Sequence, residues 1–472
     1  MKNKIISSFF ILLVLVAANA CKEDEPPLPD NLIQFATSEQ GISDNEGEAT
    51  IKLTLSRAAE TASTVVIDLT AENATYGTEF TTQPAAENNS ISLTIPVGST
   101  EASIKIIKKE NIFLTGDESL KLTLTSVTTP VLIGSTKTID IQFAAIVSDG
   151  SELTLNGIIG TEVGTAARNS IYVDFSNNET TPIDRASWDF GFYTGDLFRV
   201  ILNNTTSASA KVLDKTDLKA VVAADTVPSS DWTVGTFNPS ELALVDGVSG
   251  DVTKTVMAEV SATDADNKVY IVNRGVGGAI PARPWLKIRT IRKGNGYTLQ
   301  YARITDTEFK SIDIEKDDSY NFVYVSVDGN SAKKVAVEPQ KANWDIKWGY
   351  HMSQTPLSPG VMIPYASSDF VTINHIAGVE AAEVLTSAVS YDAFAESNIA
   401  AAEFKSTVDV IGTNWRTASS KAGESGVKND RFYVIKDLAG NVYKLRFLRF
   451  HPDEGGTRGK PELEYKLVKK GA

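Results

Sequence analysis

Short runs in which apolar and polar residues alternate constrain the fold of this chain most strongly. Between residues 49 and 143 they read ATIKLTLS, TVVIDLT, SISLTIPV, ASIKIIKK, SLKLTLTSV and TIDIQF. An alternation of period 2 predicts strands with one buried face, and the Gly, Asn, Ser and Pro residues between the runs predict turns. Little helical periodicity occurs from Leu32 onward. Residues 32–147 are therefore predicted to form one antiparallel β-sandwich.

The β pattern continues beyond residue 148 with more aromatic residues, so the whole chain is predicted to be all-β. A length of 472 residues suggests about three domains at roughly 150 residues each. The formal net charge of −14 disfavours nucleic acid as a partner. A single cysteine excludes an internal disulfide and a cysteine-based metal site. The histidines are His351, His375 and His451, so metal chemistry would draw on these, on carboxylates or on methionine.

The N-terminus has the layout of a secretory signal. Lys2 and Lys4 precede an apolar segment, residues 5–20, that ends in small residues. It is short for a membrane-spanning helix of about 20 residues, so residues 1–20 are predicted to be a signal peptide. The following Cys21 resembles the lipidated cysteine of bacterial lipoproteins, although Ala18 stands where that motif prefers leucine. The alternative is an ordinary signal peptide that leaves a free Cys21.

The residues after the cysteine point to a membrane face. Lys22, Glu23, Asp24 and Glu25 resemble the signal that sends lipoproteins of the Bacteroidetes phylum to the outside of the outer membrane. The proline-rich stretch after them predicts a stiff spacer, so residues 21–31 are a linker. We therefore expect a lipid-anchored protein of the cell outer membrane that faces outward. The alternative is a merely solvated acidic linker.

The first β segment resembles the Calx-beta domain. The resemblance rests on SDNEGEATIKLTLSR, ATYGTEF, LTIPVGSTEASIKII and GDESLKLTL, in that order. Some members of that family bind calcium, which needs 6–8 oxygen ligands. The candidate ligands here are Asp44, Glu79, Glu110, Asp117 and Glu118. Lys108 and Lys109 replace the family's acidic pair and would repel the ion, so we expect a spacer rather than a calcium site; a calcium-dependent adhesion module is the alternative.

An internal repeat organises the rest of the chain. IYVDFSNNETTPIDRASWDFGFY corresponds to VYVSVDGNSAKKVAVEPQKANWDIKWGY, and the closing KIR and KLR strands also correspond. The pairs Trp188–Asp189 and Trp344–Asp345 are 344 − 188 = 156 residues apart, and Lys287 and Lys444 are 444 − 287 = 157 apart. Two anchors with nearly one offset predict two related β units, residues 149–316 and 317–471.

Each repeated unit resembles the HmuY family of Bacteroidetes lipoproteins. The resemblance rests on the Ser/Asn-Trp-Asp-apolar stretch and on closing strands such as FYVIKDLAGNVYKLRF and ELEYKL. It covers roughly residues 150–470. It implies a hand-like all-β domain that grips haem through axial ligands on strands and loops.

If the resemblance extends to the ligand, the second unit supplies the axial groups. A six-coordinate haem needs two facing ligands and an apolar slot. The candidate haem ligands are His351, Met352, Met362 and His375. The candidate pocket residues are Trp348, Tyr350 and Tyr365. The first unit has Tyr193 where a histidine is expected. The alternative is that these aromatic residues form core or a binding platform and that the histidines are structural.

Other residues are interpreted as structural. Trp188, Asp189, Trp344 and Asp345 are predicted to be architectural, with the indole in the core and the carboxylate accepting backbone N–H groups. His451 is interpreted as a turn residue. The sequence contains no His-Glu-x-x-His, Gly-x-Ser-x-Gly or phosphate-loop motif, so we do not expect an enzyme.

We therefore expect a cell-surface lipoprotein of the ligand-binding type, with haem acquisition as the function that the resemblance implies. The alternative is a structural or interaction lipoprotein that uses the sandwich as a spacer. Its aromatic-bearing units would then hold a glycan or a partner protein such as an outer-membrane receptor.

Overall fold

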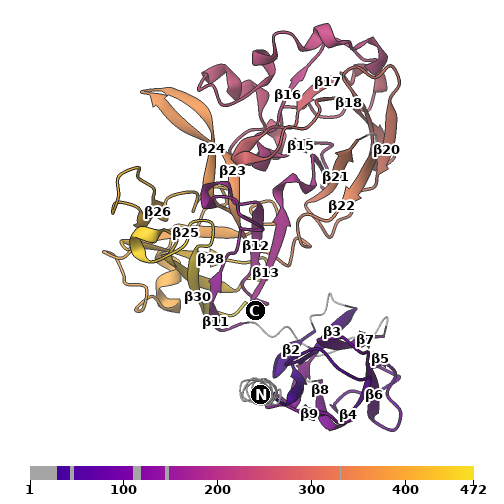
Figure 1. Ribbon diagram of the computed structural model, residues 1–472. Coiled ribbons are helices and arrows are strands. Elements are labelled where there is room, and N and C mark those ends of the chain that lie inside the picture. The colour runs from indigo at the N-terminus through magenta and orange to yellow at the C-terminus, as the bar shows by residue number, and fades with distance from the viewer. Residues whose placement is uncertain (1–28, 43–46, 110–117, 144–147, 330, 472) are drawn as a thin grey trace, which may run out of the picture. The chain divides into compact units, whose positions relative to one another are not determined.

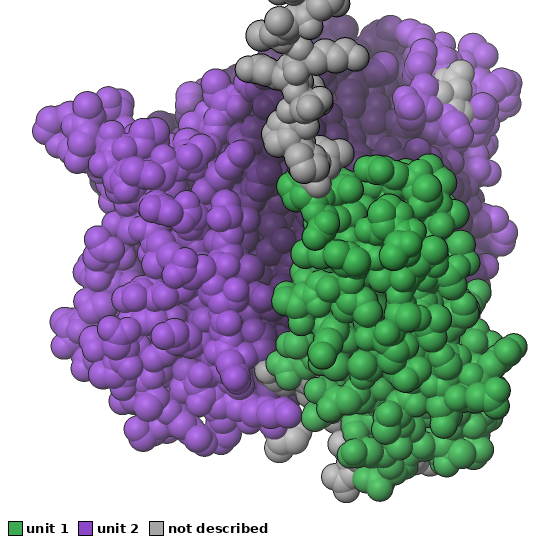
Figure 2. Space-filling model, turned by 60° about the horizontal axis from the view of Figure 1, so that its bottom comes forward, with its two compact units in different colours: residues 1–146 green, residues 147–472 purple. Residues whose placement is uncertain are grey.

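The computed structural model describes residues 29–42, 47–109, 118–143, 148–329 and 331–471. The chain divides into two compact units, residues 1–146 and 147–472, coloured separately in Figure 2. The predicted signal peptide, Cys21 and the export-signal residues Lys22, Glu23, Asp24 and Glu25 lie outside the described residues, as do Asp44, Glu110 and Asp117.

The first unit is a sandwich of two five-stranded sheets (Figure 1). One sheet contains, in spatial order, β5 (Phe80–Gln83), β7 (Glu101–Lys108), β3 (Glu48–Leu55), β1 (Asn31–Phe35) and β9 (Val131–Ile133). The other contains β2 (Glu39–Gly41), β10 (Thr138–Gln142), β8 (Ser119–Val127), β4 (Ser63–Glu72) and β6 (Ser90–Ile95).

The alternation in the sequence explains how the two sheets pack. In β3, Ile51, Leu53 and Leu55 are buried, whereas the residues between them face away from the core. Apolar residues of both sheets join one buried cluster, because successive side chains of a strand point to opposite faces. Most neighbouring strands are antiparallel, and β1–β9 and β2–β10 are parallel pairs. The predicted sandwich is confirmed.

The second unit is also built from sheets. A five-stranded sheet has the order β11 (Gly150–Thr154), β30 (Glu462–Lys469), β29 (Val442–Arg449), β28 (Arg431–Lys436) and β25 (Glu380–Leu385). Another has the order β20 (Lys310–Ile314), β19 (Gly296–Arg303), β18 (Leu286–Lys293), β17 (Tyr270–Asn273) and β16 (Ser209–Val212). Two four-stranded sheets have the orders β13 (Glu179–Asp184), β12 (Asn169–Asp174), β23 (Ile346–Ser358), β24 (Val361–Ile373) and β22 (Ser331–Val335), β21 (Phe322–Asp328), β14 (Phe190–Tyr193), β15 (Val200–Leu202). Strands β26 (Arg416–Thr417) and β27 (Gly426–Val427) form a small hairpin.

The helical elements of the described residues are short 3₁₀ turns in the connections. They are η1 (Gly164–Ala166), η2 (Arg185–Ser187), η3 (Asn204–Thr206), η4 (Leu218–Ala220), η5 (Ala223–Thr226), η6 (Ser229–Trp232), η7 (Pro239–Leu244), η8 (Val252–Lys254), η9 (Asp264–Asp266), η10 (Gly277–Ala279), η11 (Glu396–Ala401) and η12 (Pro452–Glu454). None of these has the length and apolar character needed to cross a bilayer. Because the described residues form sheets joined by turns of this short kind, the all-β prediction is confirmed.

The sheets show that the repeat is real and that its two copies are interlocked. Strands β12, β13, β14 and β15 of the first copy correspond to β21, β22, β23 and β24 of the second. If each strand is replaced by its counterpart, the sheet β13-β12-β23-β24 becomes the other four-stranded sheet, β22-β21-β14-β15. Each copy thus contributes one hairpin to each sheet. The five-stranded sheets follow the same rule, because β11 of the first copy completes the sheet of the second, and β20 completes the sheet of the first.

This pairing adds to the prediction of two related β units, residues 149–316 and 317–471. Strand β20 is the counterpart of β11 and so begins the second copy, which places the predicted boundary at 316/317 one strand too late. The copies also share sheets, and residues 147–472 form one compact unit. Sequence similarity marks the copies but does not mark which strands pair between them.

The Trp–Asp pairs stand at the points where the copies join. Each pair directly precedes a central strand, β14 or β23. The Asp189 carboxylate accepts a hydrogen bond from the Val327 N–H (2.7 Å), and the Asp345 carboxylate accepts one from the Phe175 N–H (2.8 Å). The two indoles, buried at 6% and 7% exposure, pack edge-to-face on Tyr324 and Tyr172.

Candidate functional site

A groove of about 830 Å³ lies beside the hairpin β23–β24. The hairpin has two strands of 13 residues each, and its distal part projects from the second unit (Figure 1). The opposite wall comes from residues 409–418 and from Arg458, with short stretches near Thr165 and Ser249. A volume of this size lies within the 300–1,000 Å³ that is typical of small-molecule sites.

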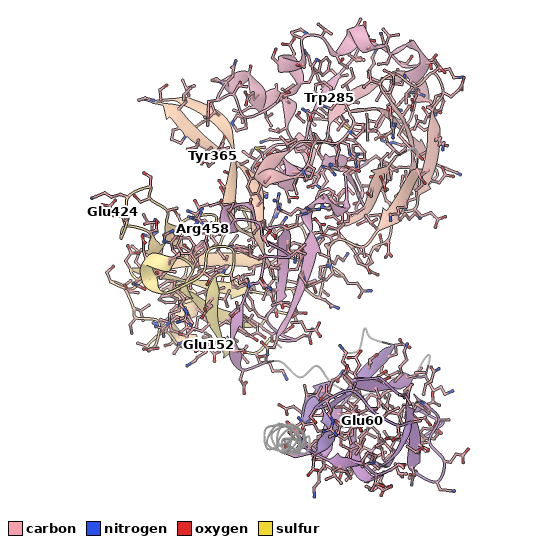
Figure 3. The ribbon with its side chains drawn as sticks, in the orientation of Figure 1. Glu60, Glu152, Trp285, Tyr365, Glu424 and Arg458 are labelled. Carbon is pink, nitrogen blue, oxygen red and sulfur yellow. The ribbon has the colours of Figure 1, made fainter. Side chains whose placement is uncertain are left out.

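Two tyrosines face the groove from the hairpin. Tyr365 on β24 is 46% exposed (Figure 3). Tyr350 on β23 is half-buried, and the guanidinium of Arg185 lies over its ring at 4.6 Å from the centroid. Arg185 is itself fully buried and donates hydrogen bonds to the carbonyl oxygens of Ala167 and Gly278. The Tyr350 ring is thus held by a fixed cation, whereas the Tyr365 ring is open to solvent.

Positive charge gathers on the groove around one buried acid. Arg416 and Arg458 both line the groove, and both contact the Asp369 carboxylate (Arg458 labelled in Figure 3). The Arg458 Nη2 atom lies 2.7 Å from Asp369 Oδ2, and the Arg416 Nε atom lies 3.7 Å from it. Two guanidinium groups against one carboxylate leave a local positive charge at this end of the groove, which suits an anionic group of a ligand, and Asp409 adds one further carboxylate to the lining.

A separate, smaller cavity of about 120 Å³ lies between the two copies of the repeat. Both Trp–Tyr pairs line it, together with the charged residues Glu338 and Lys347. Burial raises the pKa of Glu338 to about 7 and lowers the pKa of Lys347 to about 8. Asp246, Asp251, His351 and His375 line it as well, and burial also raises the pKa of Asp246, to about 6. Burial therefore penalises the charged forms of several groups around this cavity.

The structure brings His351 and His375 to this cavity rather than to the groove. His351 is 6% exposed, and its ring stacks on Phe370 at a centroid distance of 4.7 Å. Burial, and then the charge of Lys347, lowers the His351 pKa well below its ordinary value. The His375 Nε2 atom is 3.0 Å from the carbonyl oxygen of Gly250, so this ring holds a loop in place.

The family model of the HmuY protein matches residues 166–465. The chain belongs to the HmuY family. The matched region contains both the groove and the cavity almost entirely, and it spans both copies of the repeat as one family domain. A search of curated proteins gives no match.

Solved structures are similar to the chain at low identity. Near the N-terminus, the apo form of the Calx CBD1 domain is 17% identical, covers 24% of this chain and 96% of its own, and has a TM-score of 0.21. The Calx CBD2 domain is 14% identical, covers 24% and 85%, and has a TM-score of 0.21. A two-domain protein of unknown function from Bacteroides fragilis is 10% identical, covers 39% and 67%, and has a TM-score of 0.18.

HmuY-family proteins bind haem in general, so the two spaces can be tested against that group. The predicted histidine set does not fit, because the cavity that His351 and His375 share is far smaller than typical ligand pockets. The groove is large enough, but neither histidine nor methionine lines it. Its phenol groups, from Tyr350 and Tyr365, are the side chains there that can ligate haem iron.

The remaining predicted haem residues lie elsewhere. Trp348 is fully buried in the core of the second unit and lines neither the groove nor the cavity. Met352 is also buried, at 4% exposure. Met362 pairs with Pro356 near the hairpin tip, whereas His351 pairs with Ser367. A separation of five residues along β24 corresponds to about 16 Å, so Met362 and His351 cannot face one another across a haem.

The calcium candidates that the structure describes do not form a site. Glu79 and Glu118 remain of the predicted set, and Glu118 is buried at 8% exposure. The Lys109 N–H donates to the Glu79 carbonyl oxygen at 2.9 Å, which brings the lysine pair next to this candidate. Within the described ranges, no group of three or more His, Cys, Asp or Glu side chains could hold a metal ion.

His451 caps the short helix η12, where its Nδ1 atom accepts the Asp453 N–H at 3.2 Å. Sequence reasoning missed the charged residues of both spaces: Arg185, Glu338, Lys347, Arg416 and Arg458. Lys347 carried a usable signal, because it is a charged residue between the buried positions Ile346 and Trp348 of a predicted strand. The two groove arginines carried none, because strand β26 and the segment that contains Arg458 are far apart in the sequence and only the fold brings them together.

Proposed function

We propose that the protein captures a small ligand in the groove beside β23–β24, and that this ligand is haem. The observation that carries the proposal is the groove itself, which lies in the HmuY-family domain and has the volume of a small-molecule site. The proposal concerns binding rather than catalysis.

The groove offers groups for both ends of the ligand. The phenol of Tyr365 is exposed and can approach iron, since tyrosine is a known axial ligand of ferric haem. Arg416 and Arg458 supply positive charge for the two propionates, and a planar guanidinium matches a carboxylate well. Tyr350, held by Arg185, supplies a fixed aromatic surface.

A haem titration followed by absorbance tests this proposal. We expect a Soret band with the intact protein, a large loss with Tyr365→Phe, and no change with the control Tyr320→Phe outside the groove. The double variant His351→Ala/His375→Ala should retain the band. If that variant loses the band and Tyr365→Phe keeps it, haem binds at the histidines and the groove proposal fails. No spectral change with the intact protein excludes haem.

A glycan is the second candidate, and the polar lining of the groove favours it. Hydroxyl and amide groups such as those of Ser353, Gln354 and Asn414 line the groove beside the tyrosine rings. Sugars combine hydrogen-bonding edges with apolar faces that stack on aromatic rings. Binding on a glycan array that is lost with Tyr365→Ala and unaffected by haem would favour this candidate over the first.

We also propose that a lipid on Cys21 anchors the protein in the outer membrane, facing outward. The support is the sequence pattern: an apolar segment, small residues, Cys21 and three acids. Cys21→Ala should release the protein from membranes without altering its fold. Replacement of Glu23, Asp24 and Glu25 by alanine should keep it membrane-bound but hide it from protease added to intact cells.

The N-terminal sandwich then acts as a spacer between the anchor and the ligand-binding unit. We expect calcium to leave its melting temperature unchanged, because Lys108 and Lys109 lie where the family's acidic pair would be. A rise in melting temperature with calcium would contradict the spacer assignment.

A further inference from the structure

The cavity between the repeat copies is a second space with binding chemistry, and it shares no lining residue with the groove. Its walls are two edge-to-face aromatic pairs, Trp188 with Tyr324 and Trp344 with Tyr172, at centroid distances of 4.9 and 5.0 Å. Aromatic faces attract cations when water is excluded. The walls alone therefore favour a ligand with a positively charged end.

Glu338 adds a buried carboxylate to these walls. It is 6% exposed and accepts hydrogen bonds from the Phe322 N–H (2.7 Å) and the Tyr324 hydroxyl (3.2 Å). These two bonds fix the carboxylate at the cavity but do not neutralise it. A ligand ammonium would supply the missing counter-charge.

Asp246 and Asp251 also line the cavity, and the Asp246 carboxylate accepts the Leu202 and Val256 N–H groups. Lys347 adds the opposite charge. Its ammonium contacts the Tyr172 ring at 5.9 Å from the centroid, and in the part of the chain that the structure describes it has neither a hydrogen bond nor an ion pair. It is not within ion-pair distance of Glu338. The repeat offset of 156 residues places Gly191 at the corresponding position of the first copy, so the shared fold does not require a lysine here.

Two further polar atoms at the cavity are left without partners. Trp344 and His351 are 7% and 6% exposed, and Trp344 Nε1 and His351 Nδ1 have no hydrogen-bond partner among the described residues. Both residues line the cavity. An unpaired buried donor is unfavourable, and an acceptor group of a bound ligand would satisfy it.

We propose that this cavity binds a small zwitterion of the amino-acid class, with its carboxylate against Lys347 and Trp344 and its ammonium against Glu338 and the aromatic walls. The size limits the side chain, since a cavity of about 150 Å³ accommodates a benzene molecule and this one measures about 120 Å³. Glycine, L-alanine and L-serine are therefore the expected range. The site is independent of the groove and of its ligand.

The full chain can be titrated calorimetrically with glycine and L-alanine at neutral pH. We expect one equivalent to bind, with acetate and methylammonium at least tenfold weaker, because each carries half of the recognised charge. L-phenylalanine should not bind. Acetate binding as tightly as glycine would overturn the zwitterion, and no binding by any of these at millimolar concentration would leave a water-filled cavity and overturn the site.

Two variants locate the site. Lys347→Met and Glu338→Gln should each weaken glycine binding at least tenfold, whereas Lys333→Met, on the exposed strand β22, should not. Circular dichroism and thermal melting confirm that each variant is folded. If Lys347→Met does not fold, saturation-transfer NMR on the unaltered chain decides, since protons of Tyr172 and Trp344 must transfer to bound glycine. Transfer from other residues alone would overturn the assignment.

Discussion

The Asp345 carboxylate accepts a hydrogen bond at 2.8 Å from the N–H of Phe175, which lies 170 residues earlier in the chain. The corresponding Asp189 makes the same bond to Val327 at 2.7 Å. The surroundings of the two acids nevertheless differ. Asp189 also binds the guanidinium groups of Arg274 (2.8 Å) and Arg283 (3.1 Å), whereas burial raises the pKa of Asp345 well above its ordinary value.

We therefore predict that the same Asp→Asn substitution lowers the free energy of unfolding strongly at one position and little at the other. Asp189→Asn should lower the free energy of unfolding by about 3–5 kcal/mol, because the buried guanidinium of Arg274 and the partly buried one of Arg283 lose their counter-charge. Asp345→Asn should change it by less than about 1 kcal/mol, because the amide oxygen still accepts the Phe175 N–H and a buried carboxylate is no longer required. Urea unfolding measures both. Equal losses in the two variants would contradict the difference in charge state.

The raised pKa of Glu338 predicts a pH dependence of stability. Its folded-state pKa of about 7 exceeds the ordinary 4.5, so the native chain binds more protons than the unfolded chain between these pH values. The stability from this group is therefore fully present below pH 4.5 and is lost as the pH rises through 7. The unaltered chain should lose about 3 kcal/mol of unfolding free energy at most across this pH range, and Glu338→Gln should not show this loss.

Unfolding free energies at pH 5 and pH 7.5 measure the effect, and the exposed Glu403→Gln is the matched control. Lys347 does not confuse the result, because its pKa is lowered from 10.5 to about 8 and its contribution changes above pH 8. An equal pH dependence in Glu338→Gln and the unaltered chain would contradict a buried, proton-binding Glu338.

Local patterns predicted the strands well and their pairing poorly. The alternation in residues 49–55 gives β3 and its buried face directly, and the spacing of the Trp–Asp pairs reveals the repeat. The pairing of β12 with β23 joins residues more than 170 positions apart. Nothing local in either strand marks such a partner, because the same alternation suits any neighbouring strand.

The candidate site was displaced for a related reason. Tyr350 lines the groove while His351 lines the cavity, because successive side chains of a strand point to opposite faces. The register shift at this point places its extra residue on β24, where Ser368 and Asp369 lie opposite Tyr350. Composition correctly drew attention to this segment, and alternation separates the two side chains, but neither shows that distant parts of the chain build a groove on one face and a small cavity on the other.

The contact between the His375 ring and Gly250 predicts that substitutions at these two positions have non-additive effects on stability. Gly250 has a φ of +74°, and a Cβ atom there would lie 2.7 Å from the His375 ring. Gly250→Ala should therefore cost more than Gly360→Ala, where φ is +77° and no atom lies within 4 Å of the added Cβ. The difference isolates the clash from the backbone strain.

Adding His375→Ala to Gly250→Ala should recover part of that difference, and thermal unfolding of the four chains measures the coupling. His375→Ala alone should speed amide hydrogen exchange in residues 247–251, because the Gly250 carbonyl loses its partner. Additive effects of the two substitutions would show that the ring and the loop do not constrain each other.

The buried cation Arg185 is expected to affect both the stability of the fold and the ligand affinity of the groove. Its guanidinium donates to the carbonyl oxygens of Ala167 (2.8 Å), Gly277 (3.2 Å) and Gly278 (3.0 Å), and it lies over the Tyr350 ring. Arg185→Met leaves these carbonyls unpaired and should lower the free energy of unfolding by about 3 kcal/mol or more. Arg185→Lys keeps the charge but not the fork of donors, so it should restore only part of the loss. Because Arg185 holds the Tyr350 ring, Arg185→Lys should also weaken ligand binding in the groove several-fold. Arg199 contacts Glu259 on another part of the unit, so the control Arg199→Lys should leave the affinity unchanged. Equal affinity in both lysine variants would show that Arg185 serves the fold alone.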